Sequence, residues 1–414
     1  MHEGGLLNPY RILDLTDEKG YLCGKILGDL GADVIKIEMP GGDRGRRIGP
    51  FYKNIPHPEK SLFWFAYNVN KRGITLNIET SDGKEIFNKL VKTADILIES
   101  FNPGYMKQIG LGYPDISKIK SDIIMTSITP FGQEGSYSRH KSCDITAMAM
   151  SGMMSLCGDA DRPPVRVSLD QAFLHGSAHA AAACLIALNF RELEGEGQYI
   201  DVSVQASTVP PLYAELIRWI TERYVVARAG PSHYRTGKVY QRDVWPCKDG
   251  FLGWRLFGGL RGIPTVPSLI AWMDKEGMAG ELRDLDWIKV DLAKVTGDQM
   301  KRWEVLFLDF FAKHNKEEIT RFAKNKGATI SPVYTMEEVV KYGQLKERGF
   351  WTELEGPQTN DNINFPGPFC RMNNAFCDII RTAPCIGEHN LEIYESGLGF
   401  SRADLITLKG IGVI

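Results

Sequence analysis

Strand and helix signals alternate from residue 11 to residue 128, and this alternation restricts the possible fold more than any other feature of the sequence. Short apolar runs predict four strands, at 11–15, 33–38, 94–100 and 121–128. Amphipathic stretches predict two helices, at 20–32 and at 81–93, the second opened by Ser81 as its cap. Alternation at this spacing is typical of a parallel sheet with helices on both faces. We therefore predict an α/β fold.

The loops at the carboxyl ends of these strands are the expected ligand-binding edge, because parallel sheets bind ligands in the crevice beyond those ends. The loops begin after Leu15, Glu38, Ser100 and Ile128. The second loop contains GGDRGRR at 41–47, whose backbone amides and arginines could hold a phosphate. A solvated turn explains the same residues. No GxGxxG motif follows the first strand, which argues against a dinucleotide site.

Composition and charge exclude several classes of function. Hydrophobic residues make up 43% of the 414 positions and charged residues 24%, as in an ordinary globular chain. The formal net charge of −2 gives no basic surface for nucleic acid. We expect no signal peptide and no membrane contact, because no sufficiently long apolar run is evident. The eight cysteines show no metal-like spacing with the eight histidines, so we expect reduced thiols, no metal and a cytoplasmic location.

The pattern changes near Val225, where aromatic residues, shorter strands and charged helices begin. We predict a large domain from 1–224 plus 350–414, and a small domain with its linkers from 225–349. Three aromatic stretches could line a pocket for a bulky acid, although buried core is the commoner role of such residues. They read FLGWRLFGGL, IAWMDKEG and ERGFWTELE.

Asp170 stands directly before a long helical segment made mostly of small residues. Aspartate is a favoured helix cap, and the positive end of a helix favours its ionised form, so a structural cap is one interpretation. The small residues at 176–183 permit close approach of a helix or a ligand, and a carboxylate at such a joint could act as a nucleophile. His175 and His179 lie one helical turn apart, but no acidic third ligand is near in sequence, so we expect no metal.

Seven motifs occur along the chain in a characteristic order. They read RILDLT, LGDLGADVIKIEMPGGDRGR, NVNKRGITLNIET, ADILIESFNPGYM, SITPFGQEGSYS, GEGQYIDVSV and APCIGEHNLEIY. As an ordered set they resemble the class III coenzyme A transferases of the CaiB/BaiF group, which includes formyl-CoA and crotonobetainyl-CoA transferases. The resemblance is strong as far as Val204, moderate at the C-terminal end and loose in the small domain.

The resemblance implies a Rossmann-like large domain with a parallel sheet, a smaller α+β domain and an interlocked dimer. It assigns the nucleophile to Asp170 and a supporting acidic role near the thioester to Asp144. Asp170 would attack an acyl-CoA thioester, and coenzyme A would pass through an aspartyl anhydride and an aspartyl-CoA thioester to a free carboxylic acid. A carboxylate suits this exchange because its acyl derivatives are as reactive as the substrates. Coenzyme A is then a substrate, and we expect no permanently bound cofactor.

The resemblance also implies which residues line the path of coenzyme A. They are Lys19, Leu76, Ser100, Phe101, Pro103, Gly104, Met106 and Lys141, the last on the phosphate side. Asn102 and Met39 stand where arginines occur in the family, and a shielding glycine-rich loop is not evident around Gly237. Phosphate contacts could therefore fall to Arg44, Arg46, Lys71 or Arg72.

Two alternatives stay open. Acyl-CoA racemases of the same fold pair such an aspartate with a histidine, but Cys143 occupies that position here and His140 lies three residues earlier. The chain could also be one subunit of a hetero-oligomeric transferase, with a related subunit as its partner. For substrates we expect succinyl-CoA as donor and an aryl-substituted acid such as benzylsuccinate or phenyllactate as acceptor. Small dicarboxylates and carnitine-like acids stay open.

Overall fold

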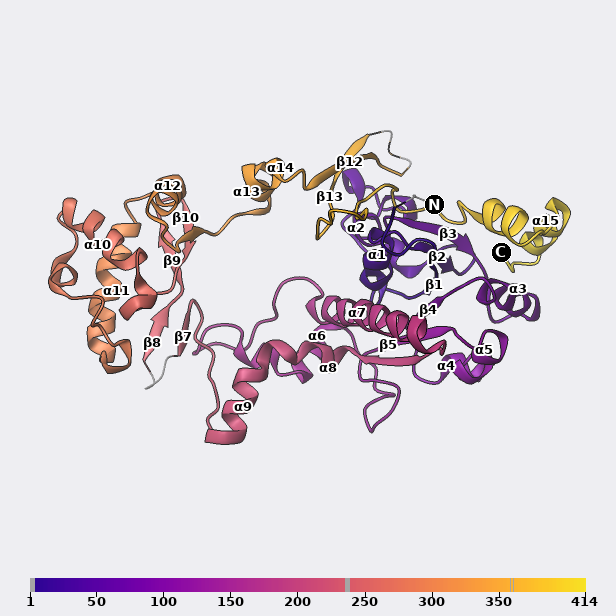
Figure 1. Cartoon of the computed structure of the whole chain (residues 1–414), viewed down its shortest axis with the longest axis horizontal. Helices are drawn as coiled ribbons and strands as arrows, with labels where there is room; N and C mark the ends of the chain where they lie inside the picture. The colour runs from indigo at the N-terminus through magenta and orange to yellow at the C-terminus, as the bar shows by residue number, and fades with distance from the viewer. Residues whose placement is uncertain (1–3, 235–238, 358, 360) are drawn as a thin grey trace. The chain divides into compact units, whose positions relative to one another are not determined.

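The computed structural model describes residues 4–234, 239–357, 359 and 361–414. They form two compact units (Figure 1). The first consists of Met1–Ser151, Ser168–Pro211 and Gly343–Ile414, and the second of Gly152–Val167 and Leu212–Tyr342. Residues 152–167 and 212–224, predicted in the large domain, lie in the second unit, and residues 343–349, predicted in the small domain, lie in the first. The loop around Gly237 lies outside the described residues.

The first unit is built on a six-stranded parallel sheet with the order β3-β2-β1-β4-β5-β6. The strands are β1 (Arg11–Leu15), β2 (Asp33–Glu38), β3 (Lys71–Thr75), β4 (Ile96–Glu99), β5 (Ile124–Thr129) and β6 (Tyr199–Ser203). The order reverses between β1 and β4, whose pairing ends with Leu15 opposite Glu99. Such a reversal opens a crevice at the carboxyl ends of the strands. The predicted α/β class with a parallel sheet is confirmed.

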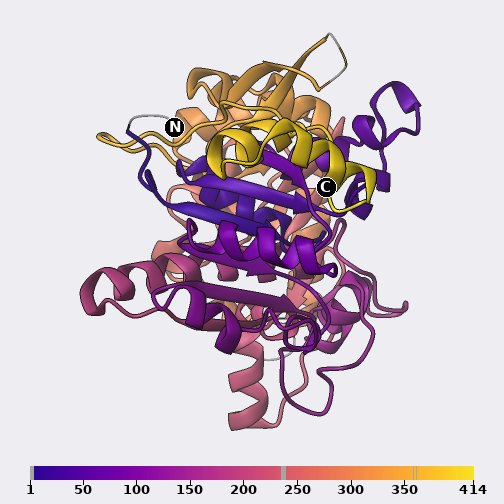
Figure 2. The same cartoon turned by 90° about the vertical axis from the view of Figure 1, so that its right-hand side faces the viewer.

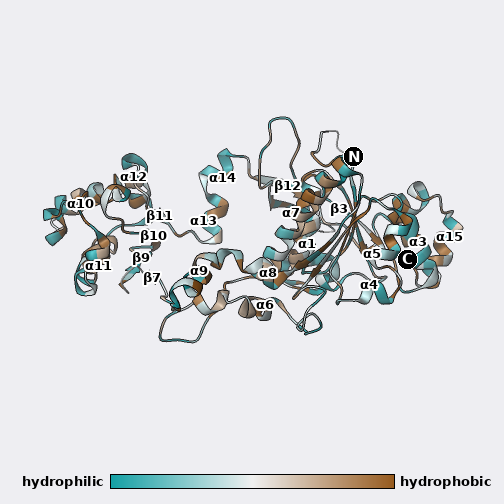
Figure 3. Cartoon of the chain, turned by 60° about the horizontal axis from the view of Figure 1, so that its bottom comes forward, coloured by the Kyte–Doolittle hydropathy of each residue, from teal (hydrophilic) through white to brown (hydrophobic). Residues whose placement is uncertain are grey.

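Helices cover both faces of this sheet (Figures 1 and 3). One face carries α1 (Tyr21–Asp29) and α7 (Gln171–Glu194). The other face, toward the viewer in Figure 2, carries α3 (Ser81–Val91), α5 (Tyr113–Ile119) and α15 (Arg402–Gly410). The unit also contains α2 (Leu62–Tyr67), α4 (Tyr105–Gln108), α6 (Asp144–Met150), α8 (Val204–Thr208), α14 (Gly343–Glu347), β12 (Trp351–Glu355), β13 (Asn362–Pro366) and a π-helix at Leu391–Gly397.

The capping residue of α3 differs from the prediction by one position. Thr80 is the cap, and its hydroxyl accepts a hydrogen bond from the amide of Gly83, whereas Ser81 is the first helical residue. Both hydroxyl residues are good caps, so sequence alone does not separate them.

The small residues of α7 allow close packing within the unit. A Cβ added at Gly176 would lie 2.8 Å from Cγ2 of Val204 in α8. The helix ends at Gly195, whose φ of +76° is readily adopted by glycine and whose amide donates to the carbonyl of Arg191. By length and composition alone α7 is apolar enough to cross a membrane, which is weak evidence for a span; 44% of its apolar window is buried, and the helix packs against α1, α8 and the sheet.

The second unit has its own core, formed where aromatic residues converge. Its helices are α9 (Tyr213–Glu222), α10 (Thr265–Lys275), α11 (Gly297–Phe311), α12 (Lys316–Lys326) and α13 (Met336–Lys341). Its strands are β7 (Ser232–Tyr234), β8 (Tyr240–Arg242), β9 (Val244–Cys247), β10 (Gly250–Gly253) and β11 (Ser331–Pro332). Trp254 is buried against Trp245 and Phe307. In the aromatic stretch FLGWRLFGGL, Trp254 is therefore part of the hydrophobic core and does not line a pocket.

Candidate active site

A cavity of about 420 Å³ lies at the carboxyl ends of the strands in the first unit. The loops after β1, β2 and β4 supply most of its wall, as expected for the point where the strand order reverses. The lining residues are Leu15, Thr16, Asp17, Ile37, Glu38, Met39, Gly42, Asp43, Arg44, Leu76, Ile78, Glu79, Ser100, Phe101, Asn102 and Tyr105. Aromatic and aliphatic side chains alternate there with polar ones, an arrangement suited to a small organic ligand.

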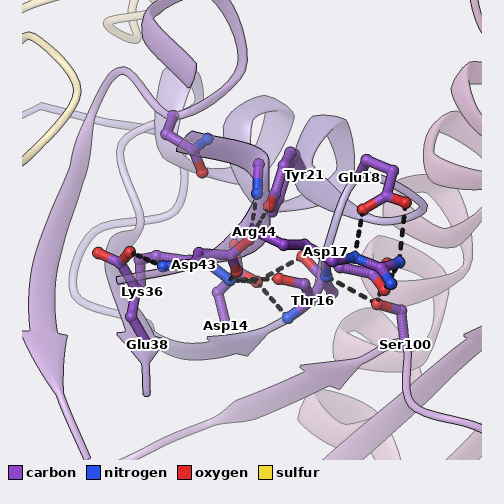
Figure 4. A network of polar contacts seen from close by, with 12 residues as sticks. Asp14, Thr16, Asp17, Glu18, Tyr21, Lys36, Glu38, Asp43, Arg44 and Ser100 are labelled. Atoms are coloured by element: carbon purple, nitrogen blue, oxygen red, sulfur yellow. Dashed lines mark hydrogen bonds and ion pairs between the residues drawn. The ribbon is translucent and has the colours of Figure 1, made fainter. Parts of the chain in front are cut away.

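A polar network fixes one wall of the cavity (Figure 4). The Asp17 amide donates to Ser100 Oγ, and Ser100 Oγ donates to Asp17 Oδ1, both at 2.8 Å. Arg44 binds Asp17 at 2.5 Å and Glu18 at 2.8 Å, and Lys19 also pairs with Asp17. Burial alone would raise the pKa of Asp17, but the charges of Lys19 and Arg44 outweigh it and hold that pKa below its usual value. The wall is therefore an ionised, cross-linked network.

A second layer of charges is buried beneath the cavity. Lys71 Nζ lies 2.8 Å from Asp14 Oδ2, and both side chains are fully buried. Arg46 is also buried and binds Glu38 at 2.7 Å and Glu59 at 2.8 Å. Lys71 and Arg46 are thus engaged in the interior.

Arg72, another suggested phosphate contact, pairs with Asp33 at 2.5 Å and with Glu392 at 2.6 Å. The suggestion that Arg46, Lys71 or Arg72 contacts phosphate has no structural support. Of the four residues suggested as phosphate contacts, Arg44 lines the cavity, and its side chain is 60% exposed.

Burial also perturbs a carboxyl group beside this cavity. Burial raises the pKa of Glu99 to about 7, although the Ser127 hydroxyl and the Phe101 amide, at 2.7 Å, hydrogen-bond to the carboxylate. Glu99 directly precedes Ser100 at the end of β4, so its protonation state is coupled to the loop that forms the cavity wall.

Asp170 occupies the N-cap position of α7, but its side chain makes no cap hydrogen bond. The carboxylate of Asp144 instead accepts from the amide of Phe173, the third residue of α7, at 3.0 Å. Leu169, directly before the joint, has a φ of +67°, a conformation that costs a residue with a Cβ about 1 kcal/mol or more. The interpretation of Asp170 as a simple helix cap is therefore wrong for this structure.

The surroundings of Asp170 connect it to other elements of the first unit. Burial raises the pKa of Tyr67, at the end of α2, and the negative charge of Asp170 raises it further. Ser177 Oγ in α7 donates to the Lys19 carbonyl at 2.8 Å. Seven residues of helix correspond to a rise of about 10 Å from Asp170 to Ser177. The loop that holds Lys19 thus links the cavity wall to α7.

The residues predicted to contact coenzyme A fall into three groups. Leu76, Ser100 and Phe101 line the cavity, and Lys19 pairs with Asp17 on its wall. Met106 is buried in the core. Pro103, Gly104 and Lys141 do not line the cavity; Gly104 is the N-cap residue before α4, with a φ of +85°, and Lys141 is exposed before α6.

Sequence reasoning missed several residues of the cavity wall. Tyr105 lines it and donates to Glu79 Oε1 at 2.7 Å, and Asp43 accepts a hydrogen bond from the buried Tyr21. The rule that ligands bind at the carboxyl ends of strands could have found Glu79 and Asp43, because both follow such ends. Among the described residues, no group of three or more His, Cys, Asp or Glu side chains is arranged to hold a metal ion.

Comparison with known proteins places this architecture in a family. Residues 7–390 match the family model described as CoA-transferase family III. The chain belongs to this family. As a family III CoA-transferase it is 32% identical to the succinyl-CoA:(R)-benzylsuccinate CoA-transferase subunit BbsE of Thauera aromatica over 408 residues, covering 98% of this chain and 97% of the relative.

A second relative is succinyl-CoA:glutarate CoA-transferase of Mus musculus, 30% identical over 418 residues, covering 99% of this chain and 90% of the relative. Among solved structures, a CaiB/BaiF family protein from Brucella suis matches the fold of this CoA-transferase with a TM-score of 0.81 at 24% identity, covering 95% of this chain and 100% of the other. The resemblance stated from the seven motifs is thereby confirmed.

Proposed function

We propose that this family III CoA-transferase moves coenzyme A from succinyl-CoA to a free aryl-substituted carboxylic acid, with Asp170 as the nucleophile. The observation that carries the proposal is the match of residues 7–390 to CoA-transferase family III, together with the place of Asp170 at the N-cap position of α7. Succinyl-CoA is the proposed donor because both named relatives carry it in their names. Benzylsuccinate is the leading acceptor because the first of them is named for it.

The proposed reaction proceeds through two kinds of covalent intermediate on Asp170. Its carboxylate oxygen attacks the thioester carbonyl of succinyl-CoA, the C–S bond breaks, and the CoA thiolate leaves with the electron pair. The thiolate then attacks the aspartyl carbonyl of the mixed anhydride, which releases succinate and leaves an aspartyl-CoA thioester. The acceptor carboxylate reverses these two steps, so acyl-CoA forms and the Asp170 carboxylate is regenerated.

The cavity at the edge of the sheet is the proposed site for the nucleotide end of coenzyme A. Phe101 and Leu76 offer apolar surface for the adenine. Arg44 offers an exposed guanidinium for a phosphate. The Lys19 loop, which borders this cavity and is held to α7 by Ser177, is the proposed route of the pantetheine arm toward Asp170.

A racemase is not proposed. Proton exchange at an alpha carbon needs an acid and a base on opposite faces of the substrate. Cys143 stands directly before Asp144 and caps α6, and the His140 ring packs against Tyr137 at 4.7 Å. Neither residue therefore places an imidazole at the position that the racemases use.

For assembly, we propose a dimer, either of two copies of this chain or with a related subunit in the cytoplasm. The word "subunit" in the name of the Thauera aromatica relative supports the second possibility. Light scattering on the purified chain distinguishes them: a stable dimer supports the homodimer, and a monomer that dimerises only with a co-expressed related chain supports the heteromer. A fully active monomer would contradict both.

A panel assay tests the substrate proposal. Succinyl-CoA, acetyl-CoA and formyl-CoA are each incubated with benzylsuccinate, phenyllactate, glutarate and mesaconate, and new thioesters are detected by mass spectrometry. We expect transfer from succinyl-CoA to benzylsuccinate at the highest kcat/KM. Preference for a small aliphatic dicarboxylate would overturn the aryl acceptor, and no transfer to any acid would overturn the transferase reaction.

A further inference from the structure

Two thiols of the first unit lie next to each other in the segment that follows β13. Cys370 and Cys377 are free thiols, and their Sγ atoms lie 3.8 Å apart. Both side chains are partly exposed, so a small molecule in solvent can reach the pair. A disulfide needs the two sulfurs about 2 Å apart, which a modest shift of one side chain supplies. The pair therefore combines proximity with access.

The backbone fixes one side of this pair and leaves the other side free of the core. Phe376, directly before Cys377, donates its amide to the Gly4 carbonyl at 2.8 Å. Residues 371–374, directly after Cys370, are exposed. The chain at Cys370 can thus shift toward Cys377 without disturbing packed side chains.

We propose that Cys370 and Cys377 are a redox-active dithiol that closes an internal disulfide when it meets a small disulfide such as oxidised glutathione. Cys370 is the thiol that attacks first. Burial, followed by the neighbouring Cys370 thiol, raises the pKa of Cys377 to about 12, so Cys377 releases its proton less readily. Since the thiolate is the nucleophile, Cys377 is suited to the second step.

The reaction consists of two thiol–disulfide exchanges. Cys370 loses its proton, and its thiolate attacks one sulfur of glutathione disulfide, which forms a mixed disulfide and releases one glutathione thiolate. Cys377 then loses its proton and attacks the Cys370 sulfur, and the second glutathione leaves with the electron pair of the broken S–S bond. The two leaving thiolates take up the two protons. Two protein thiols are thus oxidised, and one glutathione disulfide is reduced to two thiols.

The first unit contains a second pair of contacting thiols, which serves as an internal control. Cys23 in α1 and Cys184 in α7 hydrogen-bond to each other. Both side chains are 0% exposed, so a small disulfide does not reach them in the folded chain. We expect this pair to stay reduced. The comparison separates the effect of access from that of proximity.

Peptide mapping of the folded full chain tests the proposal. The protein is incubated with glutathione disulfide at neutral pH, its free thiols are alkylated in denaturant, and a tryptic digest is analysed without reduction. Arg371 separates the two cysteines, so they fall on different peptides, 349–371 and 372–381. We expect these peptides joined, two hydrogens lighter than their sum, and separated by dithiothreitol. The joined form should exceed the mixed disulfide at Cys370 about tenfold, because a neighbouring thiol acts at high effective concentration.

Three variants check the order of the two steps. Cys377→Ser should keep a glutathione adduct at Cys370, because the thiol for the second exchange is gone. Cys370→Ser should form an adduct at Cys377 about tenfold more slowly, because of the raised pKa of that thiol. Cys247→Ser is the matched control, since it removes a partly exposed thiol of the second unit and should leave the joined peptides unchanged. The wild-type measurement stands whether or not each variant folds.

The outcomes decide the proposal without an activity assay, so it does not depend on the proposed transferase reaction. Joined peptides, with Cys23 and Cys184 still alkylated, support the dithiol. Mixed disulfides without joined peptides, or unreacted thiols at Cys370 and Cys377, overturn it. Joining of Cys23 to Cys184 at the same rate also overturns it, because oxidation would then require unfolding.

Discussion

Replacing Asp14 by asparagine would leave two lysines buried beneath the cavity without the carboxylate that they share. Lys71 Nζ lies 2.8 Å and Lys36 Nζ 3.8 Å from the Asp14 oxygens, and all three side chains are fully buried. Removing one partner of a buried ion pair costs about 3–5 kcal/mol, a large part of a total stability of about 5–15 kcal/mol. Lys71 retains Tyr21 O at 2.9 Å and Asn68 Oδ1 at 3.0 Å, so we expect a cost of about 3 kcal/mol.

Hydrogen exchange followed by mass spectrometry measures this cost within the first unit, where a whole-chain melt would mix two units. Peptides from β1 and β3 should exchange about a hundredfold faster in Asp14→Asn, since about 1.4 kcal/mol corresponds to a factor of ten. Adding Lys71→Met removes one unpaired charge and should recover most of the protection. Asp361→Asn is the control, because its pair with Lys53 is largely exposed and contributes at most about 1 kcal/mol. A change below about fivefold in Asp14→Asn would refute the reasoning.

Three further predictions concern other residues of the first unit. Gly176→Val should lower the stability of the first unit by about 1–3 kcal/mol, measured by hydrogen exchange of α7 peptides, because its Cβ would lie 2.8 Å from Cγ2 of Val204; unchanged exchange would contradict the close packing. Burial raises the pKa of Glu99 to about 7 in the folded state, above its value near 4.3 in the unfolded chain. The contribution of this carboxyl to stability is therefore fully present below about pH 4.3 and is lost as the pH rises through about 7. Glu99→Gln should therefore reduce the loss of hydrogen-exchange protection in β4 and β5 peptides between pH 5 and pH 8, after correction for intrinsic exchange rates, and an unchanged loss would exclude this carboxyl as its cause. Arg44→Ala should raise KM for the CoA thioester about fivefold at low salt, whereas Arg402→Ala, an exposed control, should leave it unchanged; equal effects would remove Arg44 from the site.

The sheet could be predicted because its signals are local. The strands at Arg11–Leu15 and Asp33–Glu38 have the predicted bounds, since each is an apolar run between turn-forming residues. The α3 cap was wrong by one residue, because Thr80 and Ser81 compete for the same position. Residues 152–167 could not be assigned to the second unit, because that assignment depends on contacts distant in the sequence, such as Arg228 with the Asp159 carbonyl.

The candidate site was predictable in position but not in its charge pairing. The strand-end rule located the loops of Asp17, Arg44 and Ser100, which line the cavity. The sequence shows basic residues but not the partners that bury them, so Arg46 looked like a phosphate contact although Glu38 and Glu59 hold it inside. The capping of α7 by Asp144 was hidden for the same reason.

Covalent trapping on Asp170 tests the central claim most directly. The protein is incubated with succinyl-CoA, treated with hydroxylamine, digested and analysed by mass spectrometry. We predict a hydroxamate at Asp170 that depends on succinyl-CoA and is lost in Asp170→Asn together with turnover. Steady transfer of coenzyme A with no derivative at Asp170, or undiminished turnover by the asparagine variant, would contradict the account.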